Sequence, residues 1–183
     1  MVVAFAVSLA TNLLLVRQIQ HQNLQMATVR AMGRLAVGAS AEGIDAESMQ
    51  GRKVHLNLAD GGVPTVLYSF SPQCGWCKRN LPNVRALIAG SRGRFRIIGV
   101  STTSDGLEEY LQHAALAIPV IVNLSASSRE ALKLGGTPQT IVVSGEGRVL
   151  KNWLGAYGDG LRDEVGAFFK VALPGVLTAG DAR

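Results

Sequence analysis

A six-residue run rich in β-branched and aromatic residues at positions 65–70, TVLYSF, restricts the fold of this chain more than any other feature. Such a run is typical of a strand in the centre of a sheet. Helical periodicity begins a few residues later and continues over residues 74–89, with Pro82 as a kink within it. The apolar positions of this segment are Leu81, Val84, Leu87 and Ile88. A central strand that leads directly into an amphipathic helix is typical of α/β folds.

The rest of the chain continues this alternation of strands and helices. Further strands are predicted at residues 54–58, 95–100, 118–124, 140–144 and 149–154, and further helices at residues 105–115, 127–134 and 160–173. The last two strands are expected to form a hairpin around Gly145-Glu146-Gly147. The sequence therefore predicts an α/β fold with a central mixed sheet and helices on both faces.

The N-terminal segment, residues 2–16, is almost wholly apolar and is followed by Arg17. It is interpreted as an uncleaved membrane anchor, a cleaved signal peptide or a buried core helix. The anchor is favoured because no basic side chain precedes the run and no polar stripe divides it. By the positive-inside rule, Arg17, Arg30 and Arg34 favour a cytoplasmic position for the domain that follows. Large domains, however, are translocated with little regard to flanking charge.

These features divide the chain into four parts. Residues 1–17 are the anchor or signal segment, residues 18–45 a helical stalk and linker, residues 46–173 the folded domain, and residues 174–183 a flexible tail. The linker is placed over residues 38–47, where glycine, alanine and acidic residues replace the apolar periodicity.

The cysteine count and the charge exclude several classes of protein. The two cysteines, Cys74 and Cys77, lie too close together for a disulfide scaffold, and no second pair exists for a structural zinc site. The net charge is +5, but only Phe95 lies among the basic residues of positions 78–96, so nucleic-acid binding is not expected. The cysteines are therefore interpreted as chemically active.

The position of the cysteine pair predicts dithiol chemistry. Cys74 is expected where a strand ends and a helix begins, because the unpaired N–H groups of a helix start favour a thiolate. Cys77 lies one helical turn deeper and is expected to resolve a mixed disulfide. Gly75 leaves room for an incoming chain, and Trp76 is expected at the exposed rim. Lys78 and Arg79 raise the local positive potential beside the cysteines.

The sequence resembles the thioredoxin superfamily. Its Cys-Gly-x-Cys-Lys motif, with a proline five residues after the second cysteine, matches Cys74, Gly75, Cys77, Lys78 and Pro82. The superfamily also places a cis-proline opposite the cysteines, before an antiparallel strand, and the segment Gly136-Thr137-Pro138-Gln139-Thr140 fits this element. The resemblance implies a thioredoxin-like three-layer sandwich. It also implies that the Thr137 backbone pairs with a substrate chain like an added strand.

Within the superfamily, the chain is similar to the membrane-anchored TlpA/ResA branch, with residues 105–126 as the inserted helix-strand unit and Ser71-Pro72-Gln73 similar to the MauD type. This resemblance implies an enzyme, a thiol-disulfide oxidoreductase that exchanges dithiols and disulfides with protein partners. Its catalytic domain is expected in the bacterial periplasm, tethered to the inner membrane. The branch further implies a reductant for maturing cytochromes or other redox proteins, supplied by a membrane electron donor. No cofactor beyond the redox-active disulfide is expected.

The chain departs from its relatives at two positions. Tyr68 stands where thioredoxin has a buried aspartate, and Asn80 stands where cytochrome maturation relatives usually have a glutamate. Both carboxylates move the proton of the buried thiol in those relatives. Water or the incoming substrate is therefore expected to deprotonate Cys77 here. Tyr68 is expected either as a core aromatic or as a hydroxyl near that thiol.

Two other functions remain open at this point. A peroxiredoxin-like peroxidase would have a threonine and a proline upstream of the reactive cysteine, where this chain has Ser71 and Leu67. A copper chaperone would use both thiolates and a distant histidine, for which His113 is the candidate. No metal site is predicted.

Overall fold

The structure is a computed structural model, and it describes residues 12, 15–18 and 33–177. The chain divides into two compact units, Met1–Arg34 and Leu35–Arg183. Most of the predicted anchor and stalk lies outside the described residues, although residues 12 and 15–18 are helical. Within the described part of the chain, no helix combines the length and the apolar character needed to cross a bilayer.

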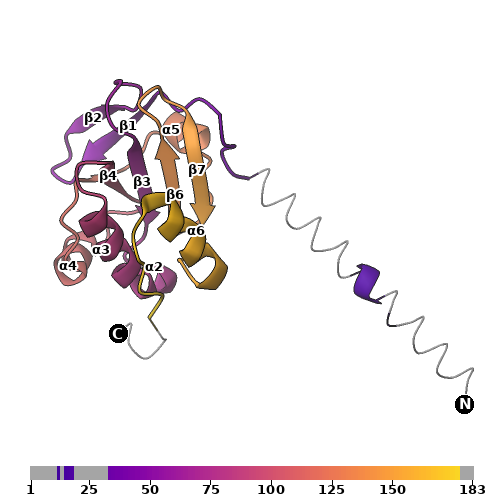
Figure 1. Cartoon of the computed structure of the whole chain (residues 1–183). Coiled ribbons are helices and arrows are strands. Elements are labelled where there is room, and N and C mark those ends of the chain that lie inside the picture. The colour runs from indigo at the N-terminus through magenta and orange to yellow at the C-terminus, as the bar shows by residue number, and fades with distance from the viewer. Residues whose placement is uncertain (1–11, 13–14, 19–32, 178–183) are drawn as a thin grey trace, which may run out of the picture. The chain divides into compact units, whose positions relative to one another are not determined.

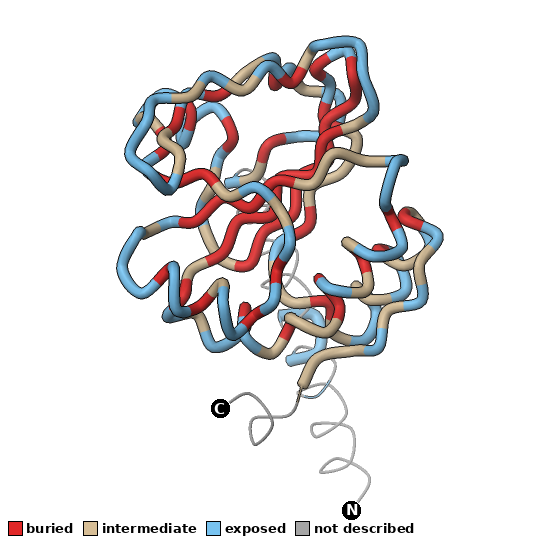
Figure 2. Tube along the Cα trace, turned by 90° about the vertical axis from the view of Figure 1, so that its left-hand side faces the viewer, coloured by how far each residue is buried: buried red, intermediate tan, exposed pale blue. Residues whose placement is uncertain are grey.

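The described part of the second unit contains a seven-stranded mixed sheet with the order β2-β1-β5-β4-β3-β6-β7 (Figure 1). Its strands are β1 Gly43–Ser48, β2 Lys53–Asn57, β3 Thr65–Phe70, β4 Arg96–Ser101, β5 Val120–Val122, β6 Gln139–Val143 and β7 Val149–Leu154. Strand β3 pairs in parallel with β4 and antiparallel with β6. All six residues of β3 are buried, which confirms the predicted central strand, and Figure 2 shows the buried residues concentrated in the strands of the sheet.

Helices cover both faces of this sheet. They are α2 Gly75–Arg79, α3 Leu81–Gly90, α4 Leu107–Ala114, α5 Ala126–Ala131 and α6 Asp159–Phe169. Because successive side chains of a strand point to opposite faces, Tyr68 and Phe70 pack with residues of α2, α3 and α4, and Val66 packs with residues of α3 and α6. Leu67 packs on the other face, in a cluster that includes Leu132 at the end of α5. The predicted α/β fold with helices on both faces is confirmed.

The predicted single helix over residues 74–89 is wrong, because two helices, α2 and α3, occupy this segment. Asn80 ends α2 and precedes α3, and Pro82 lies in the first turn of α3. Proline has no N–H to donate and its ring disfavours the preceding helical turn, so it is tolerated where a helix begins. Pro82 therefore starts a helix rather than kinking one.

The predicted linker over residues 38–47 is also wrong in its second half, because Gly43–Ser48 is strand β1. Strand β1 pairs antiparallel with both β2 and β5. Ile44 and Ala46 are buried, whereas Asp45 between them is exposed. With only two buried residues between acidic ones, the two-residue period of this strand is hidden in the sequence.

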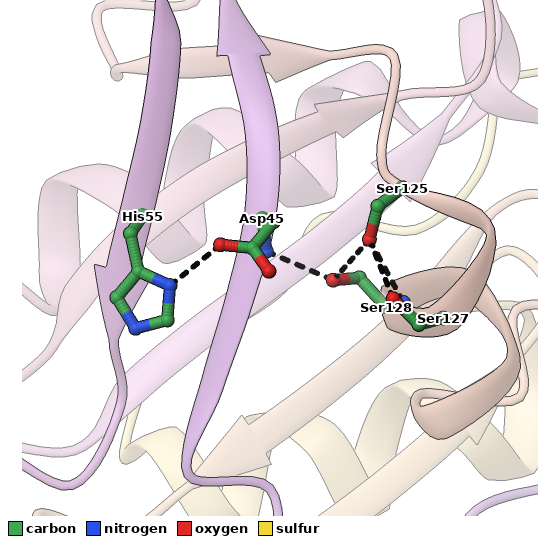
Figure 3. Close-up of polar contacts among 5 residues, drawn as sticks. All are labelled: Asp45, His55, Ser125, Ser127 and Ser128. Atoms are coloured by element: carbon green, nitrogen blue, oxygen red, sulfur yellow. Dashed lines mark hydrogen bonds and ion pairs between the residues drawn. The ribbon is translucent and has the colours of Figure 1, made fainter.

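Strand β1 is held from two sides at Asp45 (Figure 3). The backbone N–H of Asp45 donates to the Ser128 hydroxyl at the start of α5 over 2.8 Å, and the Ser125 hydroxyl donates to the same oxygen over 2.8 Å. The Asp45 carboxylate lies 2.7 Å from the ring nitrogen Nδ1 of His55 on β2. The Ser128 hydroxyl thus binds the backbone of Asp45 and not the ring of His55. These residues therefore fix strand β1 and do not form a catalytic triad.

The predicted flexible tail begins too early, because residues 174–177 are bound to the folded domain. The N–H of Gly175 donates to Oδ1 of Asn83 over 2.8 Å. The N–H of Leu177 donates to the carbonyl of Arg79 over 2.8 Å, and the Arg79 guanidinium returns a hydrogen bond to the Leu177 carbonyl over 2.7 Å. The domain therefore extends beyond residue 173, and residues 178–183 lie outside the described residues.

Candidate functional site

Cys74 lies between the end of β3 and the start of α2, as the N-cap of that helix. Its Sγ accepts a hydrogen bond from the Cys77 N–H over 3.1 Å. Its thiol also lies 3.5 Å from the carbonyl oxygen of Thr137, to which it donates. The side chain is half-buried, so the sulfur is within reach of a partner while a backbone donor is aimed at it.

Cys77 is fully buried one turn further along α2. It packs in a cluster with Tyr68, Phe70, Val84 and Tyr110. Burial, followed by the contact with the Cys74 thiol, raises the pKa of the Cys77 thiol from 9.0 to about 12. Both cysteines are unbonded thiols in the structure. The pair is therefore asymmetric, with one accessible thiol and one sheltered thiol that keeps its proton.

The peptide bond between Thr137 and Pro138 is cis, as expected. Pro138 is buried and directly precedes strand β6, which pairs antiparallel with β3. Cys74 follows β3 after a turn, so the pairing of these two strands brings Thr137 to the cysteines across 63 residues of chain. The structure thus brings together the two motifs that the sequence kept far apart.

The two residues between the cysteines form the exposed rim. A Cβ on Gly75 would meet no heavy atom within 4 Å, so the backbone there is open to an incoming chain. Trp76 is 55% exposed, and the guanidinium carbon of Arg79 lies 4.3 Å from its ring centroid. Lys78 is exposed on the same helix. All of these residues lie where the motif predicts them.

Behind Cys77, Tyr68 and Asn80 occupy the positions where relatives carry carboxylates. Burial raises the pKa of the Tyr68 hydroxyl well above its ordinary value, and the nearby Asn80 side chain offsets part of this without completing a hydrogen bond. Asn80 Oδ1 accepts from the Tyr157 N–H and from Asn83 Nδ2, each over 2.9 Å. Asn80 therefore joins the two helices to the loop after β7, and neither residue is a base at neutral pH.

Tyr110 of α4 is a residue of this site that the sequence analysis missed. It is buried and its ring stacks on Phe70 with a centroid distance of 5.3 Å. It packs in one cluster with Cys77, against which Cys74 also packs. Burial raises the pKa of its hydroxyl, and the neighbouring Cys77 and Cys74 add to this. The sequence did offer one signal, the spacing of Leu107, Tyr110 and Ala114 on one face of the helix. This spacing indicates that Tyr110 is buried, but it does not reveal that the cysteines are its neighbours.

A cavity of about 640 Å³ opens beside the cysteines between α3 and α4. Its lining includes Gln73, Lys78, Arg85, His113 and Leu177. His113 is bound through Nδ1 to the Glu109 carbonyl of its own helix, 2.8 Å away. Across residues 12, 15–18 and 33–177, no three or more His, Cys, Asp and Glu side chains gather as a metal-binding group. His113 and the two cysteines are therefore not gathered into one group of three ligands for copper.

No protein-family model matches this sequence, and no curated protein matches it significantly. Solved structures do match. The thioredoxin domain of a thiol-disulfide oxidoreductase from Bacteroides vulgatus is 24% identical, with a TM-score of 0.59, over 74% of this chain and 99% of that one. A thiol:disulfide interchange protein from Bacteroides sp. is 23% identical, with a TM-score of 0.58, over 74% of this chain and 91% of that one.

A peroxiredoxin-like protein from Aquifex aeolicus is also similar, with 15% identity and a TM-score of 0.57, over 75% of this chain and 87% of that one. At these identities the likeness establishes the fold. The chain therefore has the thioredoxin-like fold that is found in thiol-disulfide oxidoreductases of the thioredoxin superfamily.

Proposed function

We propose that this protein is a thiol-disulfide oxidoreductase that exchanges electrons with protein partners through Cys74 and Cys77. One observation carries the proposal: the accessible Cys74 Sγ accepts the Cys77 N–H and lies 3.5 Å from the Thr137 carbonyl, while Cys77 is fully buried behind it. A nucleophile and a sheltered resolving thiol are what two-step disulfide exchange requires.

In the first step, the Cys74 thiolate attacks one sulfur of a partner disulfide. The partner's S–S bond breaks, a Cys74–partner disulfide forms, and the second partner sulfur leaves as a thiolate. In the second step, the Cys77 thiolate attacks Cys74 Sγ and releases the first partner sulfur. The protein now holds the Cys74–Cys77 disulfide, and the partner has gained two electrons and becomes a dithiol after proton uptake.

The second step needs Cys77 to lose its proton. Its pKa is raised, and Tyr68 and Asn80 stand where relatives carry carboxylates, so neither of these two described residues can act as a strong base towards it. The partner thiolate released in the first step is the nearest strong base that the reaction itself supplies. We therefore assign the proton of Cys77 to that leaving thiolate, which delays resolution until a partner is bound.

The partner chain is proposed to lie across the rim of the site. The backbone of Thr137 offers an edge for strand pairing, as in other β-strand additions. Gly75 permits close approach, and Trp76 offers an exposed apolar surface. Pro138 shapes the loop that carries Thr137. Lys78 adds positive charge, and Pro82 starts the helix that supports α2.

The setting of the enzyme is also a proposal. The apolar residues 2–16 and the resemblance to the TlpA/ResA branch support an inner-membrane anchor with the catalytic domain in the periplasm. They likewise support a reductant that receives electrons from a membrane donor and serves maturing cytochromes or other redox proteins. No cofactor beyond the cysteine pair takes part in this chemistry.

Trapping of partners tests the proposal. The Cys77→Ser variant keeps the nucleophile and loses the resolving thiol, so it should accumulate partner proteins as mixed disulfides through Cys74. Cys74→Ser is the matched control and should trap none, because Cys77 is buried. Equal trapping by both variants, or trapping by neither, would contradict the assigned roles.

A peroxiredoxin-like peroxidase is the second candidate, because a peroxiredoxin-like protein shares the fold. The sequence argues against it, since Leu67 stands where such enzymes have a proline. Consumption of peroxide by the reduced protein, with turnover that needs no protein disulfide, would favour this candidate. Reduction of insulin disulfides without peroxide consumption would favour the oxidoreductase.

A further inference from the structure

The indole of Trp76 is exposed beside the cysteines, yet one of its faces is covered. The guanidinium carbon of Arg79, three residues further along α2, lies 4.3 Å from the ring centroid. Residues three apart on a helix are neighbours, and a guanidinium on an indole face is held by the attraction between its charge and the ring. The open surface of Trp76 is thus presented in a fixed orientation.

Arg79 is itself fixed by the C-terminal strap, which we define as residues 174–177. Arg79 Nε donates to the Leu177 carbonyl over 2.7 Å, and the Leu177 N–H donates to the Arg79 carbonyl over 2.8 Å. One turn further along, the Gly175 N–H is bound by Asn83 over 2.8 Å. The C-terminal strap is therefore hydrogen-bonded to both the backbone and the side chain of Arg79.

The bonds of Arg79 leave its charge directed at the indole. Among the described residues, Arg79 forms no ion pair with a carboxylate. Its Nε is used by a neutral carbonyl, which orients the plane of the guanidinium without neutralising it. A lysine in this position would keep the charge but would lose this planar, oriented contact.

We propose that Arg79, fixed by the C-terminal strap, is a positioning residue that holds Trp76 as a docking platform for an apolar side chain next to the partner's reactive cysteine. The inference rests on the proposed function and adds a determinant of partner choice. Arg79 touches neither cysteine in this scheme. It acts through Trp76, so its loss should weaken docking and leave the chemistry of the thiols intact.

The orientation of Trp76 is tested first, by acrylamide quenching of its fluorescence. The only other tryptophan, Trp153, is 4% exposed, and a Trp153→Phe background removes it. Arg79→Ala should raise the quenching constant of Trp76 by about twofold, and Arg79→Lys should give an intermediate value. Leu177→Pro removes the N–H that binds the Arg79 carbonyl and should resemble Arg79→Ala. Leu177→Ala keeps both backbone bonds and should match the parent.

Docking is tested with two cyclic disulfide peptides that differ only in the residue beside one cysteine, leucine in one and serine in the other. The parent protein should show a lower KM for the leucine peptide, and Arg79→Ala should raise that KM about fivefold, which corresponds to about 1 kcal/mol. The kcat and the rate with a small aromatic disulfide should not change. In a Trp76→Ala background, Arg79→Ala should have no further effect on KM.

The outcomes separate the inference from the proposed function. A parent protein that reduces neither the peptides nor the small disulfide would refute the proposed function. A parent that reduces both peptides with equal KM, or an Arg79→Ala variant that keeps the preference, would overturn the inference alone. Changed quenching with an unchanged KM would also overturn it, because Arg79 would then hold Trp76 without serving docking.

Discussion

Cys77 of the reduced protein should keep its proton up to about pH 10, because its side chain is buried. Burial raises the pKa of Cys77 from 9.0 to about 12, a difference of three pH units. At about 1.36 kcal/mol per unit, the folded state disfavours the Cys77 thiolate by on the order of 4 kcal/mol relative to an exposed thiol. The cause is the loss of solvation in the apolar cluster that contains Phe70, Val84 and Tyr110.

The sign of the effect on stability follows from proton binding. Between about pH 9 and pH 12 the folded state keeps a proton on Cys77 that the unfolded chain has released, so the stability of the reduced protein should fall as pH rises through this window. Below pH 9 the contribution is fully present. The Cys74–Cys77 disulfide form has no thiol to titrate and should lose less stability over the same range.

The measurement is the ultraviolet absorbance of thiolate in Cys74→Ser, which isolates Cys77, with the double variant Cys74→Ser, Cys77→Ser as the reference for tyrosine ionisation. The absorbance of Cys77 should not rise below about pH 10. The reduction potential of the parent should still fall by at least about 30 mV per pH unit at pH 10, since at least the proton of Cys77 accompanies each pair of electrons. A Cys77 midpoint near pH 9 would refute the link between burial and the pKa.

Two further predictions concern the stability of the fold around the site. Gly145→Ala should lower the free energy of unfolding by about 1–3 kcal/mol, because a Cβ there would overlap the carbonyl oxygen of Gly62; a melting temperature equal to that of the parent would contradict this. Tyr157→Phe should cost about 1–3 kcal/mol in a urea titration, because it leaves the buried Thr140 hydroxyl without the partner that lies 2.6 Å away. Thr140→Val together with Tyr157→Phe should recover part of this loss, and an additive cost would count against the hydrogen bond.

The elements that sequence predicted best are those whose residues are buried in one simple pattern. Strand β3 was predicted to its exact ends because all six residues are buried, so no charged or exposed residue interrupts its run of β-branched and aromatic side chains. Strand β1 is as long as β3, but it was missed because only two of its residues are buried and its solvent face is acidic. The hydrophobic period of a strand with two buried residues is too brief to stand out from a linker.

The residues of the candidate site divide in the same way. Cys74, Cys77 and Pro138 were found because a motif of fixed spacing marks each of them. Tyr110 was not found, and Arg79 was expected only as a nearby positive charge, because their contacts depend on neighbours that no local pattern reveals. Tyr110 reaches the cysteines from α4. Arg79 is hydrogen-bonded to Leu177 of the C-terminal strap, which lies 98 residues further along the chain.

The sequence by itself determined the spacing of the two thiols, the strand before them and the helical start at which they lie. These are local properties, because hydrophobic period and backbone preference act over a few residues. Only the tertiary structure decided that Thr137 lies against Cys74, that Cys77 is enclosed, and that residues 174–177 bind α2. Those contacts join distant segments, and they depend on how the sheet and its helices pack together as a whole.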